Sequence, residues 1–379
     1  MINTERLLTL FAQRYGTGGT AYFAPGRINL IGEHTDYNGG FVFPAAIDCG
    51  ITAVIAPRGD GCIALYAADL DKECRFTLDD EEGPSDLDFR YVYGVVRELR
   101  AAGVGVGAFS AVYAGDVPMG AGMSSSAALE CCFAYALDNL CRGGLDRMTL
   151  AKIGQATEHK YVGVKCGLMD QFASMYGKEG ALMRLDCCSG EFRYFPWKAD
   201  GYRLLLVNSC VKHQLVGSPY NERRESCERV AAMAGVATLR DCLPEKLESV
   251  GSQLCDVDYR RARYVLEEEK RVMAVSDALE RGDIEEVGRQ MYLTHEGLSR
   301  DYEVSCEELD FLVDEARKAG VSGARMMGGG FGGCTINLMR EEFCNAFIGQ
   351  VKSSYRDRFG IECIPIPVVI GAGAREIEN

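Results

Sequence analysis

The stretch from Ala24 to Asp48, APGRINLIGEHTDYNGGFVFPAAID, places a dense group of polar side chains between two apolar segments. A surface loop would not need the apolar flanks, and a core strand would not tolerate charges that have no partner. The polar side chains are Arg27, Asn29, Glu33, His34, Thr35, Asp36, Tyr37 and Asn38. This pattern predicts the floor of a ligand pocket, where buried polar groups find their partners on the ligand.

The length of the chain, 379 residues, is long for a single hydrophobic core and favours two domains. Segments 107–118 and 202–212 have the character of strands, and segments 125–141, 149–163 and 258–282 show helical periodicity. Strands and helices alternate irregularly, which predicts an α+β fold. We place the boundary after a strand-like segment that ends the first polar region, giving domains of residues 1–185 and 186–379.

The charge and the cysteines exclude several classes of protein. The chain has 41 basic and 55 acidic residues, a net charge of −14, and no basic run, so nucleic acid and membrane partners are not expected. Neither a signal peptide nor an apolar run of membrane-spanning length is visible. The 17 scattered cysteines are typical of reduced thiols, which predicts a cytoplasmic protein. The oligomeric state is left open, a monomer included.

A second informative stretch is GDVPMGAGMSSSAALE, residues 115–130. Gly120 and Gly122 form a flexible turn, and three serines then lead into an apolar stripe with helical period. The pattern predicts a serine N-cap and an anion site at the helix N-terminus. No Gly-Lys-Ser/Thr follows, so the loop lacks the lysine of a Walker motif, and Mg²⁺ is the expected source of positive charge. The alternative is a Gly/Ser turn that only caps a helix.

A third stretch, RMMGGGFGGCTINL, has five glycines between Gly328 and Gly333. This density permits positive φ angles and a close approach of backbone segments. A tight turn between core elements needs only one or two glycines, so we favour a functional loop over a glycine-rich β turn.

The three stretches resemble the three motifs of the GHMP kinases, a superfamily of small-molecule kinases. The first stretch, GRINLIGEHTDYNGG, and the segments CGLMDQF (166–172) and GSPYNERRESCE (217–228) resemble the galactokinase family in particular. The resemblance extends over about residues 21–333. It implies a two-domain α+β fold with the active site in the cleft between domains, and ATP-dependent phosphorylation of D-galactose at its anomeric hydroxyl.

The resemblance also implies roles for individual residues. Arg27 and Asp170 match the catalytic pair, and Ser126 and Glu158 match the pair associated with Mg²⁺. The positions that match sugar contacts are Glu33, His34, Thr35, Asp36, Gly167 and Tyr220. The positions that match the loop around the triphosphate of ATP are Gly120, Ala121, Gly122, Met123, Ser124, Ser125 and Ser126. Met123 stands where leucine is commoner in the family, and Ala128 stands where serine is common. Neither difference touches the chemistry.

These residue types suit the implied roles. Glu33 and Asp36 can each accept sugar hydroxyls, and a pocket that reads hydroxyls in this way rejects a wrong epimer because a buried partner is left unpaired. Asp170 precedes the helical segment QFASMYG and is expected near a helix N-terminus; a purely structural N-cap is the alternative. Phosphoryl transfer usually passes through a loose transition state, so Asp170 can orient the hydroxyl and take its proton late.

Two other functions stay open. One is a related sugar 1-kinase that acts on N-acetylgalactosamine or L-arabinose. The other is a sensor that binds galactose and ATP without chemistry. Such sensors lack a Ser-Ala dipeptide in the serine loop, whereas Ser126-Ala127 is present here together with Arg27 and Asp170, which favours an enzyme.

Overall fold

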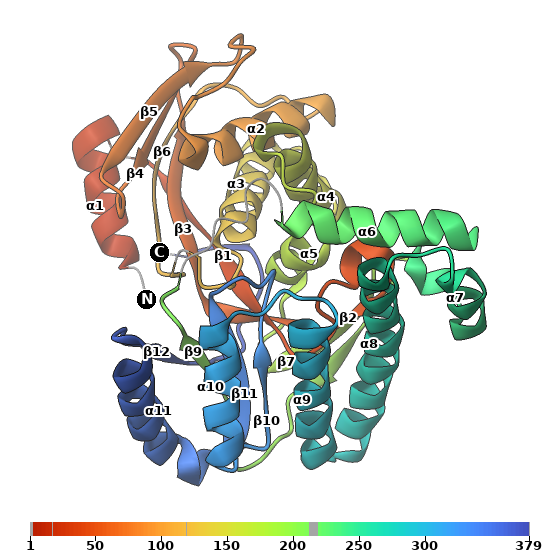
Figure 1. The fold of residues 1–379 in the computed structure, drawn as a ribbon. Helices are drawn as coiled ribbons and strands as arrows, with labels where there is room; N and C mark the ends of the chain where they lie inside the picture. The colour runs from red at the N-terminus through yellow and green to blue at the C-terminus, as the bar shows by residue number, and fades with distance from the viewer. Residues whose placement is uncertain (1–2, 17, 119, 212–218, 379) are drawn as a thin grey trace.

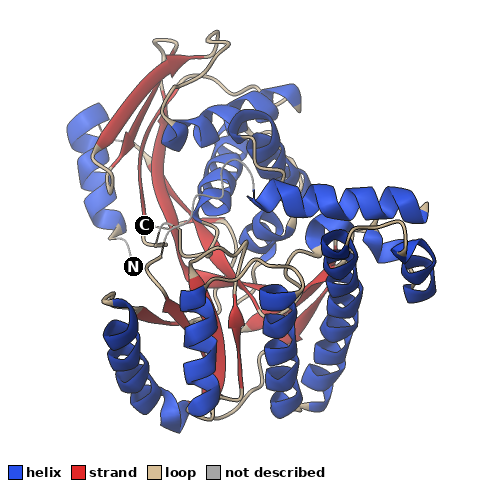
Figure 2. Cartoon of the chain, in the orientation of Figure 1, coloured by secondary structure: helices blue, strands red, loops and turns tan. Residues whose placement is uncertain are grey.

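The computed structural model describes residues 3–16, 18–118, 120–211 and 219–378. Met119 of the serine loop and the first two residues of segment 217–228 lie outside the described residues. Helices and sheets are mixed along the chain, so the predicted α+β class is confirmed (Figure 2). Within the described ranges, no helix has the length and apolar character needed to cross a membrane.

The strands form three sheets, with the orders β13-β1-β3-β6-β4-β5, β10-β11-β9-β12 and β2-β7-β8. All neighbours are antiparallel except β4 and β6. The strands are β1 Thr20–Asn29, β2 Phe41–Val42, β3 Pro44–Pro57, β4 Cys62–Ala67, β5 Lys72–Thr77, β6 Phe109–Gly115, β7 Ala181–Asp186, β8 Phe192–Pro196, β9 Tyr202–Asn208, β10 Gly323–Met326, β11 Cys334–Arg340, β12 Ile364–Pro367 and β13 Arg375–Glu376.

Most of the helices pack on these sheets, whereas α6 and α7 pack against α8 (Figure 1). They are α1 Thr4–Tyr15, α2 Leu87–Ala101, α3 Ser125–Cys141, α4 Arg147–Thr157, α5 Met169–Tyr176, α6 Pro219–Ala234, α7 Pro244–Gly251, α8 Asp256–Arg281, α9 Ile284–Arg300, α10 Glu307–Lys318 and α11 Cys344–Phe359. Short helical turns are η1 Asp36–Asn38, η2 Glu158–Val162, η3 Leu239–Asp241 and η4 Glu341–Phe343. The strands predicted within 107–118 and 202–212 and the helices predicted within 125–141 and 258–282 are confirmed.

The central strands of the six-stranded sheet are buried on both faces, because α1 packs on one face and α2, α3 and α4 pack on the other. Ala21 and Val54 point to the face that α1 covers, and their neighbours Tyr22 and Ala53 point to the face that packs against the core of α2, α3 and α4. The last strand, β13, pairs with β1, so the chain returns near its end to the sheet that holds its first strand.

The four-stranded sheet has α8 and α9 on one face and α10 and α11 on the other (Figure 1). Leu204 and Leu206 of β9 belong to the first of these cores, together with Ile28 and Leu30 from the polar stretch of the N-terminal part. Leu205 and Val207 belong to the second. The apolar flanks of the first sequence stretch are therefore buried against the C-terminal part of the chain, which fixes the polar residues between them.

Candidate active site

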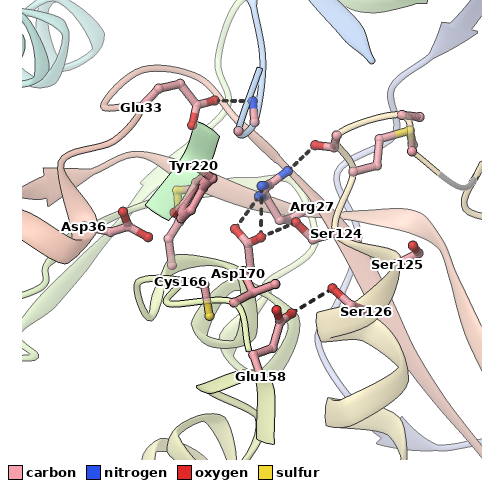
Figure 3. A pocket seen from close by; sticks show the side chains of 18 of the residues that line it. Arg27, Glu33, Asp36, Ser124, Ser125, Ser126, Glu158, Cys166, Asp170 and Tyr220 are labelled. Carbon is pink, nitrogen blue, oxygen red and sulfur yellow. Dashed lines mark hydrogen bonds and ion pairs between the residues drawn. The ribbon is translucent and has the colours of Figure 1, made fainter. Parts of the chain in front are cut away.

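A cavity between the N-terminal and C-terminal parts of the chain brings most of the predicted site residues together (Figure 3). The predicted residues that line it are Arg27, Glu33, His34, Asp36, Gly120, Ala121, Gly122, Met123, Ser124, Ser125, Ser126, Glu158, Asp170 and Tyr220. Gly328 and Gly329 of the late glycine cluster also line it, as do Pro118, Val164, Cys166 and Met169. Thr35 and Gly167 lie next to the cavity without lining it.

Arg27 and Asp170 form a two-pronged ion pair at the centre of the cavity (Figure 3). Arg27 Nε donates to Asp170 Oδ1 at 2.8 Å, and Nη2 donates to Oδ2 at 3.1 Å. Arg27 is buried on β1, whereas 28% of the Asp170 side chain is exposed. The predicted placement of Asp170 in the first turn of a helix, α5, is confirmed. The pair fixes a carboxylate of defined orientation at a surface that a ligand can reach.

The serine loop enters α3 in a way that the sequence did not predict. Ser124 occupies the N-cap position with φ 59° and ψ 52°, and no serine side chain caps the helix. The prediction of a serine at the N-cap is therefore confirmed, but the expected hydrogen bond from its hydroxyl to the helix backbone is absent. The Ser124 hydroxyl donates to Asp170 Oδ2 instead, and the Ser126 hydroxyl donates to Glu158 Oε1 at 2.8 Å. Because the hydroxyls serve side chains of the cavity, the backbone N–H groups of the first turn stay available to an anion.

The late glycine cluster packs directly on the serine loop. A Cβ at Gly122 would lie 2.8 Å from the Met327 carbonyl oxygen, and a Cβ at Gly328 would lie 3.0 Å from the Gly122 carbonyl oxygen. Both glycines also have positive φ angles, 71° and 84°. Two backbone segments that are far apart in the sequence thus approach at a distance that excludes side chains, which is the physical reason for glycine at these positions.

Glu158 and Ser126 form an oxygen-rich corner of the cavity. Glu158 is the first residue of the π-helical turn η2, which continues α4 and turns the side chain inward. Burial raises the pKa of Glu158 to about 7, and the nearby charge of Asp170 acts in the same direction. Carboxylate and hydroxyl oxygens are ligands that suit Mg²⁺, and a cation here would offset the cost of burying the charge, so the two residues fit the predicted metal.

Glu130, one turn further along α3, is fully buried behind this corner. Burial raises its pKa well above the usual range, and the neighbouring charge of Glu158 adds to the effect. Its Oε2 accepts a hydrogen bond from Gln171 Nε2 at 3.0 Å, while Oε1 has no partner among the described residues. Burial and the nearby carboxylate of Glu158 both favour the neutral form of this carboxyl group.

On the opposite side of the cavity, Glu33 and His34 face inward from the loop after β1. Glu33 Oε1 accepts the Gly328 N–H at 2.8 Å. His34 has φ 62°, and its Nδ1 lies 2.7 Å from the Tyr37 hydroxyl, whereas Nε2 lies near the Gly329 backbone without a well-formed hydrogen bond. Burial lowers the pKa of His34 to about 3, so the ring is neutral and its Nε2 can pair with a ligand hydroxyl.

Asp36 packs its side chain directly against Gly167. A Cβ at Gly167 would lie 1.9 Å from Asp36 Oδ2, so only glycine leaves room for this carboxylate. Burial raises the pKa of Asp36 to about 7, and the nearby charge of Asp170 contributes in the same direction. Gly167 therefore acts on the cavity through Asp36.

Thr35 holds the loop in place. Its buried hydroxyl lies 3.0 Å from the Gly32 carbonyl oxygen and 2.7 Å from the Phe41 carbonyl oxygen. It thereby ties the start of the polar loop to its end. Tyr220, at the start of α6, packs its ring 5.4 Å from the His34 ring and forms the wall beside Asp36 (Figure 3).

Several residues of the site escaped the sequence reasoning. Arg325, fully buried on β10, contacts Glu33, and Cys166 lines the cavity beside Asp170. Arg325 opens the glycine-rich stretch RMMGGGFGGC, so its position in that motif was the available signal. Cys166 stands in the segment CGLMDQF, where the sequence reasoning treated cysteine only as a small apolar residue.

Comparisons with known proteins agree with this geometry. A galactokinase galactose-binding signature matches residues 9–57, and the N-terminal and C-terminal domains of GHMP kinases match residues 90–178 and 275–343. The galactokinase of Bacillus subtilis is 37% identical, with 99% of each chain covered, and that of Thermotoga neapolitana is 40% identical, covering 89% of this chain and 95% of that protein.

Solved structures give the same picture. The structure of Lactococcus lactis galactokinase complexed with galactose has a TM-score of 0.94 and 34% identity, and covers 99% of this chain and all of that one. The mevalonate kinase of Methanococcus jannaschii, at 20% identity, has a TM-score of 0.69 and covers 93% of this chain and 99% of that one. The second likeness concerns the fold alone.

Proposed function

This chain belongs to the galactokinase family of the GHMP kinases, and we propose that it transfers the terminal phosphoryl group of ATP to the anomeric hydroxyl of D-galactose. The observation that supports this assignment most strongly is the cavity itself. It places the ligand-facing groups of Glu33, His34 and Asp36 on one side, the serine loop on the other, and the Arg27–Asp170 pair between them. The two proposed domains, residues 1–185 and 186–379, both contribute to it.

In this proposal, the sugar is recognised by hydrogen bonds. The sugar hydroxyls form hydrogen bonds with the Oε2 oxygen of Glu33, the Nε2 atom of His34 and the carboxylate of Asp36. The Tyr220 ring forms one wall of the pocket. Gly167 makes room for Asp36, and Thr35 holds the loop that presents all three side chains. An epimer that misplaces one hydroxyl leaves a buried protein group unpaired and is rejected.

Asp170 and Arg27 have different roles in phosphoryl transfer. Asp170 orients the anomeric hydroxyl, whose oxygen bonds to the terminal phosphorus while the bond from that phosphorus to the bridging oxygen of ADP breaks. The hydroxyl proton passes to the Asp170 carboxylate. Arg27, a permanent cation, holds Asp170 in place and lies beside the phosphoryl group as charge develops on its oxygens.

The serine loop, Gly120 to Ser126, binds the triphosphate through its backbone N–H groups and the N-terminus of α3. We propose that Ser126 and Glu158 hold Mg²⁺, which supplies positive charge to the triphosphate when it is bound. The loop has no lysine of the Walker type, so a bound cation is the expected source of positive charge at this end of the cavity.

The direct test is an assay of ADP release with a panel of sugars. We expect turnover with D-galactose and far lower kcat/KM with D-glucose, because the epimeric hydroxyl leaves an acceptor of the pocket unpaired. Protein with Asp170→Asn, purified in the same way, controls for contaminating kinases. Turnover of N-acetylgalactosamine or L-arabinose in place of galactose would instead identify a related sugar 1-kinase. Galactose binding without ADP release would identify a sensor.

The metal assignment predicts that Glu158→Gln raises the half-saturating Mg²⁺ concentration by ~10-fold or more, because a liganding oxygen loses its charge. Glu130→Gln is the matched control, since Glu130 is a buried glutamate nearby, and the amide oxygen of glutamine can still accept the hydrogen bond from Gln171. The measurement is kcat/KM across a Mg²⁺ titration at fixed ATP. Full activity of the unaltered protein in excess chelator would contradict the assignment.

Galactose affinity should weaken as the pH falls below about 7. Burial raises the pKa of Asp36 to about 7, and below this pH the protonated carboxyl loses acceptor capacity for sugar hydroxyls. If the protonated form does not bind, the dissociation constant rises toward ~10-fold per pH unit. Calorimetry across pH measures it. The Asp36→Asn protein should bind galactose weakly, with an affinity that does not change with pH. Asp186→Asn, a substitution outside the cavity, should keep the pH dependence of the unaltered protein. If the affinity of Asp36→Asn still changed with pH, another group would be responsible.

A further inference from the structure

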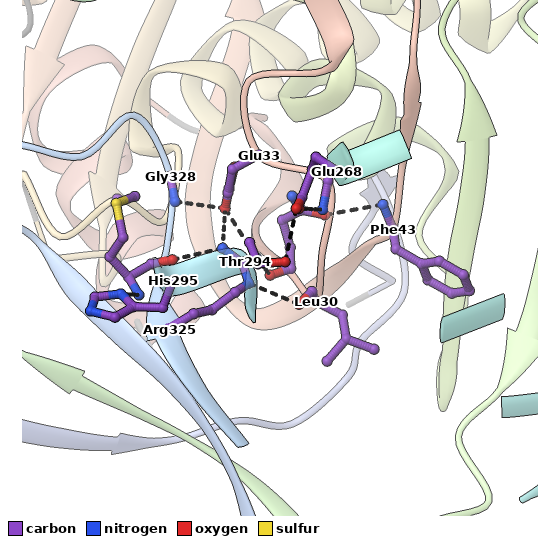
Figure 4. A network of polar contacts seen from close by, with 12 residues as sticks. Leu30, Glu33, Phe43, Glu268, Thr294, His295, Arg325 and Gly328 are labelled. Carbon is purple, nitrogen blue, oxygen red and sulfur yellow. Dashed lines mark hydrogen bonds and ion pairs between the residues drawn. The ribbon is translucent and has the colours of Figure 1, made fainter. Parts of the chain in front are cut away.

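Arg325 is a fully buried arginine whose guanidinium group uses every one of its donors (Figure 4). Its Nε donates to the Leu30 carbonyl oxygen at 2.9 Å, and its Nη1 donates to the Met326 carbonyl oxygen at 2.6 Å. Nη2 donates to the Asn29 carbonyl oxygen. The remaining donors of Nη1 and Nη2 both point to Glu33 Oε1, at 3.1 and 3.2 Å. Such a rigid fork determines the position of what it holds.

The two carboxylate oxygens of Glu33 differ in their hydrogen bonds. Oε1 accepts Nη1 and Nη2 of Arg325 and the Gly328 N–H, so it is saturated. Among the described residues, no hydrogen bond is made to Oε2, and Glu33 lines the cavity. One oxygen therefore belongs to the protein and the other is available to a ligand.

We propose that Arg325 is a positioning residue for sugar recognition, which locks the Glu33 carboxylate so that Oε2 alone faces the ligand. The proposal rests on the assignment of Glu33 as a sugar contact made above. Glu33 stands in a loop, and without the contacts from Arg325 its side chain could adopt several rotamers. Binding of the sugar would then cost conformational entropy, because only one of these rotamers would be kept. The Arg325 side chain comes from β10, a strand of the four-stranded sheet, so the folded chain itself supplies these contacts to Glu33.

A neighbouring buried pair provides the comparison. Glu268 accepts the Gly32 N–H at 2.8 Å through Oε1, and through Oε2 it accepts Arg271 Nε at 2.7 Å and the Thr294 hydroxyl at 2.8 Å (Figure 4). This pair supports the same loop from α8, and the hydrogen bonds of the Glu33 side chain among the described residues come from Arg325 and Gly328 instead. Loss of Arg271 therefore disturbs a buried ion pair of the loop while leaving the lock on Glu33 in place.

The test is a double-mutant cycle with Arg325→Lys and Glu33→Gln, measured as the KM for galactose and as kcat at saturating galactose. Lysine keeps the charge but cannot hold Oε1 from two nitrogens while also serving three carbonyl groups. We expect each single variant to raise the KM by about tenfold or more, with a much smaller change in kcat, and the double variant to resemble Glu33→Gln alone. Arg271→Lys, the matched control, should lower the Tm without raising the KM.

Arg325→Gln is the second variant, because combined with Glu33→Gln it buries a neutral pair in place of an unpaired charge. Additive KM effects in the cycle, or an Arg325→Lys protein with the KM of the unaltered enzyme, would overturn the proposal. Equal KM effects of Arg271→Lys and Arg325→Lys would do the same, since they would reflect general loosening of the loop. If Glu33→Gln alone leaves the KM unchanged while galactose is still phosphorylated, the sugar-contact assignment fails and the kinase activity stands.

Discussion

Asp170→Asn is expected to lower kcat by ~10²-fold or more while galactose still binds. Asparagine keeps the size of aspartate and one acceptor oxygen, so the contacts from Arg27 and Ser124 are partly retained. It cannot accept the proton of the attacking hydroxyl, and it no longer orients that hydroxyl through a charged oxygen. Steady-state kinetics gives kcat, and calorimetry gives the affinity for galactose.

A matched control for this substitution exists in the same chain. Asp258 is held by the Arg229 guanidinium, at 2.9 Å from Nη2 and 3.2 Å from Nε, and by the hydroxyl of Ser226. This arrangement of arginine, serine and aspartate repeats that around Asp170 but lies outside the cavity. Asp258→Asn should cost stability and leave kcat unchanged. Near-normal kcat in Asp170→Asn would make the ion pair at the start of α5 structural.

The second large effect is expected from Gly167→Ala, which should raise the KM for galactose on the order of 10²-fold. The added methyl group would lie 1.9 Å from Oδ2, 2.1 Å from Cγ and 2.6 Å from Cβ of Asp36. A clash with Cβ cannot be relieved by rotating the end of the side chain, so Asp36 must leave its position. The KM for ATP should change much less, because the serine loop does not touch this contact.

Gly349→Ala is the control for the substitution itself. Gly349 stands on α11, and a Cβ there would meet no atom within 4 Å, so activity should be unchanged. Measurement of both variants by sugar and nucleotide titrations separates loss of the sugar site from general damage. A Gly167→Ala enzyme with normal galactose KM would mean that Asp36 tolerates displacement and contributes little to recognition.

The sequence by itself determined the elements and the kind of site. Periodic apolar residues report the local backbone, so strands β6 and β9 and helices α3 and α8 could be predicted from their own segments. Polar residues between buried flanks indicated a ligand pocket because burial without a partner is costly. The three stretches that resemble the GHMP kinase motifs also sufficed to predict the α+β fold and the kinase activity.

Only the tertiary structure decided which atoms of the site are free and which are occupied. One of the three serine hydroxyls was expected to cap α3, but the Ser124 hydroxyl reaches Asp170, a contact between residues 46 positions apart. Arg325 and Glu33 are 292 positions apart, and no local pattern relates them. Burial of Asp36 and Glu158, which raises the pKa of each to about 7, also results from the packing of distant segments. Local sequence encodes backbone preference, whereas the environment of a side chain is set by long-range contacts that exist only in the folded chain.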